Sequence, residues 1–162
     1  MSRLRILTIV NLIILPLDQA TKLYVDARFL LHESVSVIPG LFQLTYVRNK
    51  GAAFGILADS AVRIPFFITI TVLALAGILW YLRQLHDRQW LTVFALSLVF
   101  AGALGNLIDR IRLGEVIDFL DVYWGRYHWP AFNVADSAIT VGVTLLIVDM
   151  LREEYRRKHH TA

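Results

Sequence analysis

The amino-acid sequence predicts an all-α polytopic membrane protein, with four transmembrane helices and a small outer β-domain between the first and second helices. The first observation is composition: of 162 residues, 57% are hydrophobic and 18% are charged, with a mean hydropathy of +0.57. A soluble domain carries about a quarter charged residues. The other observations are four long apolar runs and a stretch of alternating residues after the first run. We expect a single membrane domain, residues 1–162.

Four apolar runs are expected to span the membrane. Residues 64–82 and 90–108 are each 19 residues long and contain no charge. At about 1.5 Å per residue, each run roughly matches the ~30 Å hydrocarbon core of a bilayer. Residues 6–25 and 131–151 are also apolar but carry polar residues. The first run follows two arginines, as in a signal peptide, but it lacks the small residues of a cleavage site, so we expect it to be retained.

The distribution of lysine and arginine predicts the orientation of the spans. These residues are densest before the first run, in the connection 83–89 and in the tail 152–162, and sparser in segments 26–63 and 110–130. Cytoplasmic segments of membrane proteins carry the excess of basic residues. We therefore expect both termini and the tail in the cytoplasm, and segments 26–63 and 110–130 on the outer side.

The segment between the first two spans has the pattern of short strands. Residues 34–37 alternate between polar and apolar, and apolar residues recur at every second position over 42–46. The dipeptide Pro39-Gly40 separates the two stretches, as in a turn. This pattern predicts β-strands in an outer β-cradle over residues 26–63.

Two further outer segments are suited to the membrane boundary. Residues 51–57 are apolar enough to lie at the membrane surface, where they could act as a flap over a site. The second outer loop, 110–130, carries aromatic residues of the kind enriched at the headgroup boundary, namely Trp124, Tyr127 and Trp129.

Polar residues inside the apolar runs are the most informative feature of the sequence. In three runs their spacings of three, four or seven place each set on one helical face. The sets are Asn11, Asp18 and Lys22 in the first run, Gly102, Asn106 and Asp109 in the third, and Asn133, Asp136, Thr140 and Thr144 in the fourth. An ionisable residue at bilayer depth costs about 2.5–3.5 kcal/mol on insertion scales. Such residues either join helices through hydrogen bonds or form a functional site.

The residue types present limit the chemistry of such a site. The chain has no cysteine, which excludes thiolate nucleophiles and cysteine-based metal sites. Its five histidines do not have the spacing of metal ligands, and no base is paired with Ser97 by spacing. The basic residues form no stripe with interleaved aromatics, so nucleic acid is not an expected partner.

Aspartates remain as candidate catalytic residues. Two carboxylates held close together cannot both ionise cheaply, so one keeps its proton and the pair offers both an acid and a base. Such a pair can activate water for attack on a peptide carbonyl. Asp136 lies near the outer start of the fourth run, and its partner could be Asp109, Asp118 or Asp121. Spacing alone does not choose among these three.

Five short motifs in sequence order resemble those of the bacterial lipoprotein signal peptidases (signal peptidase II), a family of aspartic intramembrane peptidases. They are D-Q-A-T-K at 18–22, R-N-K-G-A-A-F at 48–54, G-A-L-G-N-L-I-D-R at 102–110, V-I-D-F at 116–119 and F-N-V-A-D-S at 132–137. Each motif is weak alone. Their order, the four spans and the chain length together make the resemblance specific.

The resemblance implies a fold, a substrate and a location. Members of the family are multi-pass proteins of the bacterial cytoplasmic (inner) membrane, with four transmembrane helices, cytoplasmic termini and an active site near the outer face. They are aspartic endopeptidases that cut prolipoproteins just before the diacylglyceryl-modified cysteine. The implied partners are lipid-modified prolipoproteins, membrane lipid and globomycin-type inhibitors. We expect a monomer that needs no metal or cofactor.

The resemblance also assigns roles to residues. The catalytic pair of the family falls on Asp118 and Asp136. Eight further residues are expected to bind substrate or to support the pair: Asp18, Lys22, Asn49, Gly51, Asn106, Asp109, Arg110 and Asn133. Intramembrane carboxylates also fit two other functions, a proton-coupled membrane transporter and a non-catalytic membrane scaffold.

Overall fold

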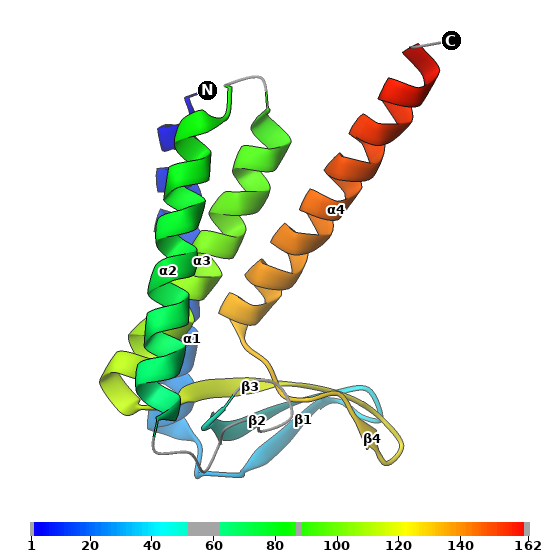
Figure 1. Cartoon of the computed structure of the whole chain (residues 1–162). Helices are drawn as coiled ribbons and strands as arrows, with labels where there is room; N and C mark the ends of the chain where they lie inside the picture. Colours follow the sequence, from blue (N-terminus) through cyan, green and yellow to red (C-terminus); the bar gives the residue numbers. More distant parts are fainter. Residues whose placement is uncertain (1, 52–61, 87–88, 161–162) are drawn as a thin grey trace.

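The computed structural model describes residues 2–51, 62–86 and 89–160. Within these residues, the helices are α1 (Arg3–Arg28), α2 (Arg63–Gln84), α3 (Trp90–Leu113) and α4 (Val134–His160) (Figure 1). The strands are β1 (Ser34–Ile38), β2 (Phe42–Asn49), β3 (Val116–Trp124) and β4 (Tyr127–His128). All four helices of this described part are long and apolar enough to cross a membrane. The predicted class, four membrane-spanning helices with a small β-domain, is confirmed.

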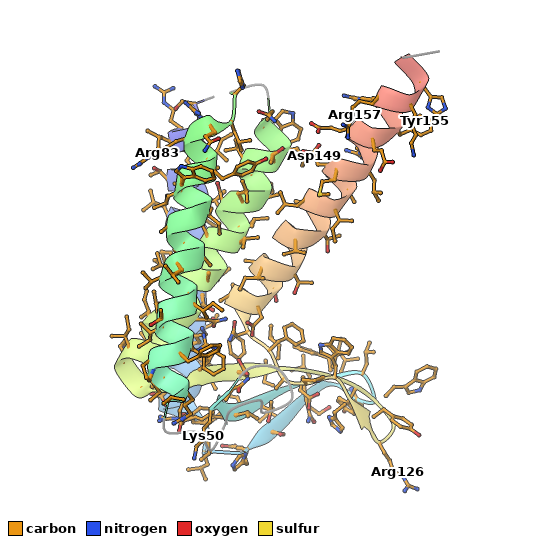
Figure 2. All side chains as sticks on the ribbon, viewed as in Figure 1. Lys50, Arg83, Arg126, Asp149, Tyr155 and Arg157 are labelled. Carbon is orange, nitrogen blue, oxygen red and sulfur yellow. The ribbon has the colours of Figure 1, made fainter. Side chains whose placement is uncertain are left out.

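The molecule has two distinct ends. Figure 1 shows both chain termini at one end of the helices, which we call the terminal end, and the sheet at the other, which we call the sheet end. Figure 2 shows Arg83, Asp149 and Arg157 near the terminal end. Lys50 and Arg126 lie at the sheet end in the same view.

Helix α3 is the centre of the bundle, because it packs against α1, α2 and α4. Two glycines allow α3 and α4 to come close together. A Cβ atom added at Gly142 of α4 would lie 2.7 Å from the carbonyl oxygen of Ala95, and one added at Gly102 of α3 would overlap the backbone of Ala135. This close approach brings the polar residues of α3 against the start of α4.

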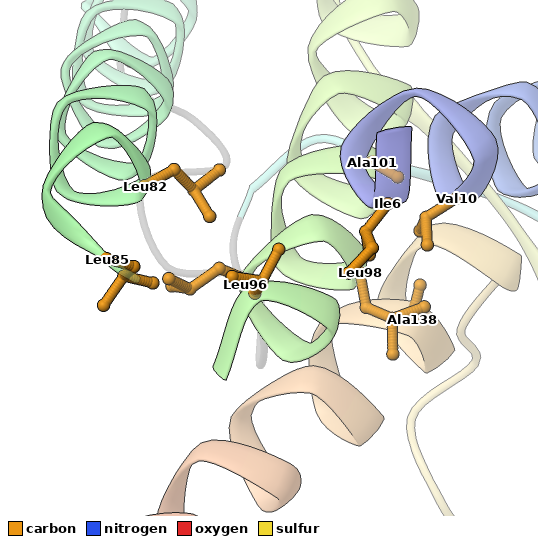
Figure 3. Close-up of a cluster of buried hydrophobic side chains, with 9 residues drawn as sticks. Ile6, Val10, Leu82, Leu85, Leu96, Leu98, Ala101 and Ala138 are labelled. Carbon is orange, nitrogen blue, oxygen red and sulfur yellow. The ribbon is translucent and has the colours of Figure 1, made fainter. Parts of the chain in front are cut away.

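Apolar side chains fill the bundle from its terminal end as far as Ala138, in the second turn of α4. The cluster, shown in Figure 3, consists of Ile6, Val10, Leu82, Leu85, Val93, Leu96, Leu98, Ala101 and Ala138. The Arg3 guanidinium closes the end of α2 by donating to the carbonyl oxygens of Leu82 at 3.2 Å and Arg83 at 2.6 Å, and also to that of Leu85. A cation at a helix C-terminus is favourable because the last carbonyls carry partial negative charge.

The sheet draws its strands from both outer segments. Its order is β1-β2-β3-β4, with antiparallel neighbours. The sequence predicts strands only in residues 26–63, so the contribution of β3 and β4 was missed. The reason is burial: Val116, Ile117 and Phe119 are all buried, so β3 begins as an almost continuous apolar run without the alternation of a half-buried strand.

Two local features connect the sheet to the helices. Helix α3 ends at Gly114, whose φ of 71° is left-handed and whose N–H donates to the carbonyl oxygen of Arg110 at 3.1 Å. Glycine adopts this conformation at little cost, so the chain can turn directly from α3 into β3. Val25 of α1 then packs with Tyr46 of β2 and Phe119 of β3 in a second apolar cluster.

Candidate active site

A cavity of about 1050 Å³ lies at the sheet end, between the end of β2, the start of β3, α3 and α4. Six of the residues predicted from the sequence line it: Asn49, Gly51, Asn106, Arg110, Asp118 and Asp136. The other four are buried behind the lining: Asp18, Lys22, Asp109 and Asn133. Lys22 bonds Asn106 and pairs with Asp18 and Asp109, Asn133 bonds Asp118, and Asp18 accepts the N–H of Ala135 beside Asp136. The structure therefore brings all ten into one region.

Asp118 reaches the cavity from β3, where it pairs with Val47 of β2. Its side chain accepts hydrogen bonds from two asparagine amides, Asn49 Nδ2 at 3.0 Å and Asn133 Nδ2 at 2.7 Å. The residue is only 2% exposed. Its carboxyl group is thus held from two sides.

Asp136 lies in the first turn of α4, where it forms a reciprocal cap with Asn133. The Asp136 N–H donates to Asn133 Oδ1 at 2.9 Å, and the Asn133 N–H donates to Asp136 Oδ2 at 3.2 Å. This exchange resembles a capping box, in which residues three apart satisfy each other's backbone N–H groups. It explains why α4 begins at Val134, three residues after the expected start of the fourth span.

Two asparagines connect the aspartates. Asn106 Nδ2 donates to Asp136 Oδ1 at 2.7 Å. The Asn133 side-chain amide, which also bonds Asp118, lies 3.2 Å from Asn106 Oδ1. Because every polar atom of these amides has a partner, neither asparagine can rotate without losing hydrogen bonds. The two carboxyl groups are therefore fixed relative to each other.

A buried ion cluster lies behind this pair. Lys22 Nζ of α1 contacts Asp18 Oδ2 at 2.9 Å and Asp109 Oδ2 at 3.0 Å, and it donates to Asn106 Oδ1 at 2.9 Å. The lysine is 1% exposed. Its bond to Asn106 orients that amide, so that the nitrogen points to Asp136.

The geometry separates the three aspartates that the sequence leaves open. Asp109 is bound in the ion cluster and accepts the Ile117 N–H at 3.2 Å. Asp121 lies three positions after Asp118 on β3, so its side chain points to the other face of the sheet. There it contacts His128 Nδ1 at 2.8 Å. Of these three, only Asp118 lines the cavity with Asp136.

Asp118 lies outside the four helices, and its surroundings favour the protonated form. Burial, followed by the negative charge of Asp136, raises the pKa of Asp118 from 3.8 to about 7. The amides of Asn49 and Asn133 oppose this rise by stabilising the charged form. Near neutral pH, the pair can therefore offer a protonated Asp118 beside a second carboxyl group.

Comparison with known proteins identifies the family to which this chain belongs. A family model described as signal peptidase (SPase) II matches residues 10–152. The chain belongs to the signal peptidase II family.

Curated relatives and solved structures agree with this family. Lipoprotein signal peptidases of Geobacter sulfurreducens and Geobacter metallireducens are 62% and 59% identical to this chain over 153 residues, covering 94% of this chain and 96% and 94% of theirs. A solved structure described as a bacterial membrane enzyme has a TM-score of 0.85 at 36% identity, covering 91% of this chain and 88% of that one. As a member of the signal peptidase II family, the chain is a multi-pass membrane protease.

Part of the wall of this signal peptidase II cavity was not predicted from the sequence. Trp129, Pro130 and Phe132 line it because Phe132 pairs with Leu120 of β3, a contact between distant segments that no local pattern reveals. Arg48, the first residue of the motif at 48–54, also lines the cavity.

The side chain of Arg48 is held by two contacts. Its Nε donates to the Tyr46 hydroxyl at 2.7 Å, and its terminal nitrogen donates to Asp26 at 2.8 Å. The Tyr46 hydroxyl in turn donates to Asp26. These contacts fix a cation in the wall of the cavity.

The sequence predicts a flap over the site and no metal ion. Of the predicted flap, 51–57, only Gly51 belongs to the described residues; it is buried, and its N–H donates to Asn49 Oδ1 at 3.0 Å. The rest of that segment lies outside them. Among residues 2–51, 62–86 and 89–160, no three histidine, aspartate or glutamate side chains are grouped so that they could hold a metal ion.

Proposed function

We propose that this protein removes the signal peptide from lipoprotein precursors, with Asp118 and Asp136 as its catalytic pair. The observation that carries the proposal is that these two aspartates, one from β3 and one from α4, line one cavity and are connected through two asparagine amides. Membership of the signal peptidase II family favours this function over a transporter or a scaffold.

In the proposed reaction, Asp118 holds the proton and Asp136 is charged. Asp136 takes a proton from a water molecule as the water oxygen attacks the carbonyl carbon of the scissile bond. Asp118 gives its proton to the carbonyl oxygen, which completes a neutral tetrahedral intermediate. When the C–N bond breaks, Asp136 returns its proton to the leaving nitrogen and Asp118 recovers a proton from the intermediate. Both carboxyl groups then have their starting protonation.

The remaining cavity residues are proposed to bind the substrate. Arg110 places its guanidinium in the cavity, 5.1 Å from the centre of the Phe67 ring. This cation and the amide of Asn49 suit the carbonyl groups of an extended peptide. Phe132 and Val141 give the cavity an apolar side. Val141 lies on a membrane-spanning helix and is 51% exposed, so this side opens toward lipid.

This opening fits a lipid-anchored substrate. Acyl chains attached to a cysteine can stay in the bilayer while the adjacent peptide bond reaches the aspartates. We therefore propose that the cut falls just before the diacylglyceryl-modified cysteine. Globomycin-type peptides are expected to inhibit by occupying the same cavity.

We further propose a bacterial inner-membrane location, with the terminal end in the cytoplasm and the sheet end outside. Four basic residues near the end of α4 support this orientation under the rule that cytoplasmic segments carry the excess of lysine and arginine: Arg152, Arg156, Arg157 and Lys158. The protein is expected to act as a monomer.

Processing of a defined precursor tests the proposed function. The purified protein in detergent is incubated with a lipidated precursor and, in parallel, with the same precursor without lipid, and the new N-terminus is identified by mass spectrometry. We expect cleavage before the modified cysteine, inhibition by globomycin, and no product from the unlipidated precursor or from the Asp136→Asn variant. Cleavage elsewhere, or full activity of that variant, would refute the proposal.

A further inference from the structure

The start of helix α2 is anchored at the sheet end by two contacts. The Arg63 guanidinium donates to the carbonyl oxygen of Lys50, just after β2, at 2.7 Å. Ile64 lies against the end of α3, where a Cβ atom added at Gly114 would come within 3.0 Å of its Cδ1 atom. Figure 1 shows this end of α2 beside the sheet. These contacts fix the place of the side chains one turn further along α2.

Phe67, one turn after Arg63, lies against Arg110, one turn before the end of α3. The central carbon of the Arg110 guanidinium is over the Phe67 ring, 5.1 Å from its centre. A guanidinium within about 6 Å of the ring centre is attracted by the negative charge of the ring face, more strongly where water is excluded. The pair therefore forms a cation–π interaction between α2 and α3.

Arg110 has little other support in the described part of the chain. One terminal nitrogen donates to the carbonyl oxygen of Asn106, in the same helix, at 3.4 Å, which is long for a hydrogen bond. The charges of Asp136 and Asp118 attract the guanidinium. Among the described residues, however, no carboxylate lies within ion-pair distance of it. Phe67 thus supplies the contact that holds this cation from outside its own helix.

This kind of contact leaves the arginine able to bind a ligand. An ion pair would occupy its N–H groups with carboxylate oxygens. The phenylalanine ring stabilises the charge but offers no lone pair, so the N–H donors stay available. Arg110 lines the cavity together with Asp118 and Asp136, where a peptide carbonyl oxygen could accept from these donors.

We propose that Phe67 is a positioning residue, which holds the Arg110 guanidinium in the cavity wall so that its N–H groups meet carbonyl oxygens of the substrate peptide. The identity of this ligand rests on the proposed function, whereas the contact between ring and guanidinium does not. Phe67 lies in none of the five motifs. The proposal gives α2, whose apolar stretch is otherwise open to lipid, a role in the active site.

Processing kinetics test the proposal with a matched set of variants. Phe67→Leu removes the ring face but keeps an apolar side chain, and Phe67→Tyr keeps the ring face. Phe94→Leu is the control, because it makes the same change on α3, where Phe94 packs against the apolar cluster of the terminal end. We expect KM for a lipidated precursor to rise about 2–30-fold in Phe67→Leu, with kcat changed less than about twofold. Phe67→Tyr and Phe94→Leu should keep the KM of the unmodified protein.

A double-mutant cycle separates positioning from a general loss of packing. In the Arg110→Gln background, Phe67→Leu should raise KM no further, because the group that it positions is already gone. Additive effects of the two changes would overturn the proposal. Equal KM values for Phe67→Leu and Phe94→Leu would overturn it as well.

A second measurement does not need processing. The full chain is labelled with ¹⁵N-arginine in detergent micelles, and the Nε–H signal of Arg110 is identified by its loss in Arg110→Lys. The ring current of Phe67 should shift this proton upfield in the unmodified protein and in Phe94→Leu, and Phe67→Leu should abolish the shift. An unchanged shift in Phe67→Leu would overturn the proposal whatever the activity. If the shift depends on Phe67 but the unmodified protein processes no precursor, the contact is upheld and the proposed function fails.

Discussion

The sheet end and the terminal end of the helix bundle are held together by different contacts. At the sheet end, buried charges and amides join α1, α3, β3 and the start of α4: Asp18, Lys22, Asn106, Asp109 and Asn133. At the terminal end, apolar side chains make most of the contacts among α1, α2 and α3, while Arg3 bonds the last carbonyls of α2 and Thr92 of α3 donates to Asp149 of α4 at 2.6 Å. The buried Ser97 bonds within its own helix, to the carbonyl oxygen of Val93 at 2.7 Å.

This difference assigns separate roles to the two ends. Lipid tails are as apolar as leucine, so the apolar contacts of the terminal end contribute only packing and tolerate changes of shape. Buried ionic groups must be completely paired, because removing one partner leaves an uncompensated charge. The residues proposed to catalyse thus lie where the contacts are most directional and least replaceable.

Loss of the central cation at the sheet end should have the largest effect. Lys22→Met leaves Asp18 and Asp109 without their counter-ion, and we expect a loss of about 3–5 kcal/mol in the free energy of unfolding. Reversible unfolding in mixed micelles, followed by circular dichroism, measures the loss. Lys158→Met is the control, since in the described part of the chain this lysine is 70% exposed and forms an ion pair with Glu154 on the helix surface. Equal stability of both variants would show that the cluster does not hold the bundle.

Removal of one positioning amide should reduce catalysis more than stability. Asn106→Ala deletes the donor to Asp136, a hydrogen bond to a charged group worth about 1.5–3 kcal/mol, so kcat should fall roughly 10–100-fold with KM little changed. The matched control is Asn11→Ala on α1, where the amide bonds only the Leu7 carbonyl in the described structure. A similar kcat for both variants would exclude a positioning role for Asn106.

The pH dependence of processing should follow the proton of Asp118. Burial and the charge of Asp136 raise its pKa to about 7, so the protonated form is lost as the pH rises through 7. We expect kcat/KM to fall about tenfold per pH unit well above that value. A rate that stays constant from pH 6 to 9 would contradict the assignment of Asp118 as the acid.

The free energy of unfolding should also fall as the pH rises toward 7. A carboxyl group whose pKa is raised from 3.8 to about 7 contributes stability that is complete below 3.8 and is lost as the pH rises to 7. Asp118→Asn should remove this dependence, and unfolding measured at pH 5 and pH 8 checks it.

A change in the terminal end should have the smallest effect. Leu96→Ala removes a buried side chain from the apolar cluster, and we expect a loss of about 2–3 kcal/mol in the free energy of unfolding, the low end of the range for this change because lipid tails are as apolar as leucine, with processing unchanged at permissive temperature. A drop in kcat as large as that of Asn106→Ala would show that the two ends are not separate.

The sequence was sufficient for the helices but not for the whole sheet. Apolar length alone predicts four spans, and alternation predicts β1 and β2. Strand β3 escapes this reasoning because its first residues are buried on both faces, so they lack the alternation that predicts a half-buried strand. The sequence also places the start of the fourth span three residues too early, at residue 131. Ala131 and Phe132 are apolar and continue the apolar run, but the hydrogen bonds between Asn133 and Asp136 begin the helix only at Val134.

The site was predictable in composition but not in arrangement. Helical spacing places the polar residues of α1, α3 and α4 on one face of each helix. Because polar side chains are costly when they face lipid, these three faces are expected to face one another. Spacing cannot choose among Asp109, Asp118 and Asp121, because two of them lie on a strand whose register depends on β2. The resemblance made that choice, and only the folded chain shows that Lys22 orients Asn106 or that Phe132 reaches Leu120.

The most direct test of the account compares two aspartates on the same strand. Asp118→Asn and Asp121→Asn each replace a carboxyl group by an amide, at positions three residues apart, one in the cavity and one at His128 on the opposite face. Processing of a lipidated precursor should fall at least about 10³-fold in the first variant, as expected for loss of an acid–base group, and stay within about threefold of the unmodified protein in the second. Equal activity of the two folded variants would contradict the catalytic pair of Asp118 and Asp136.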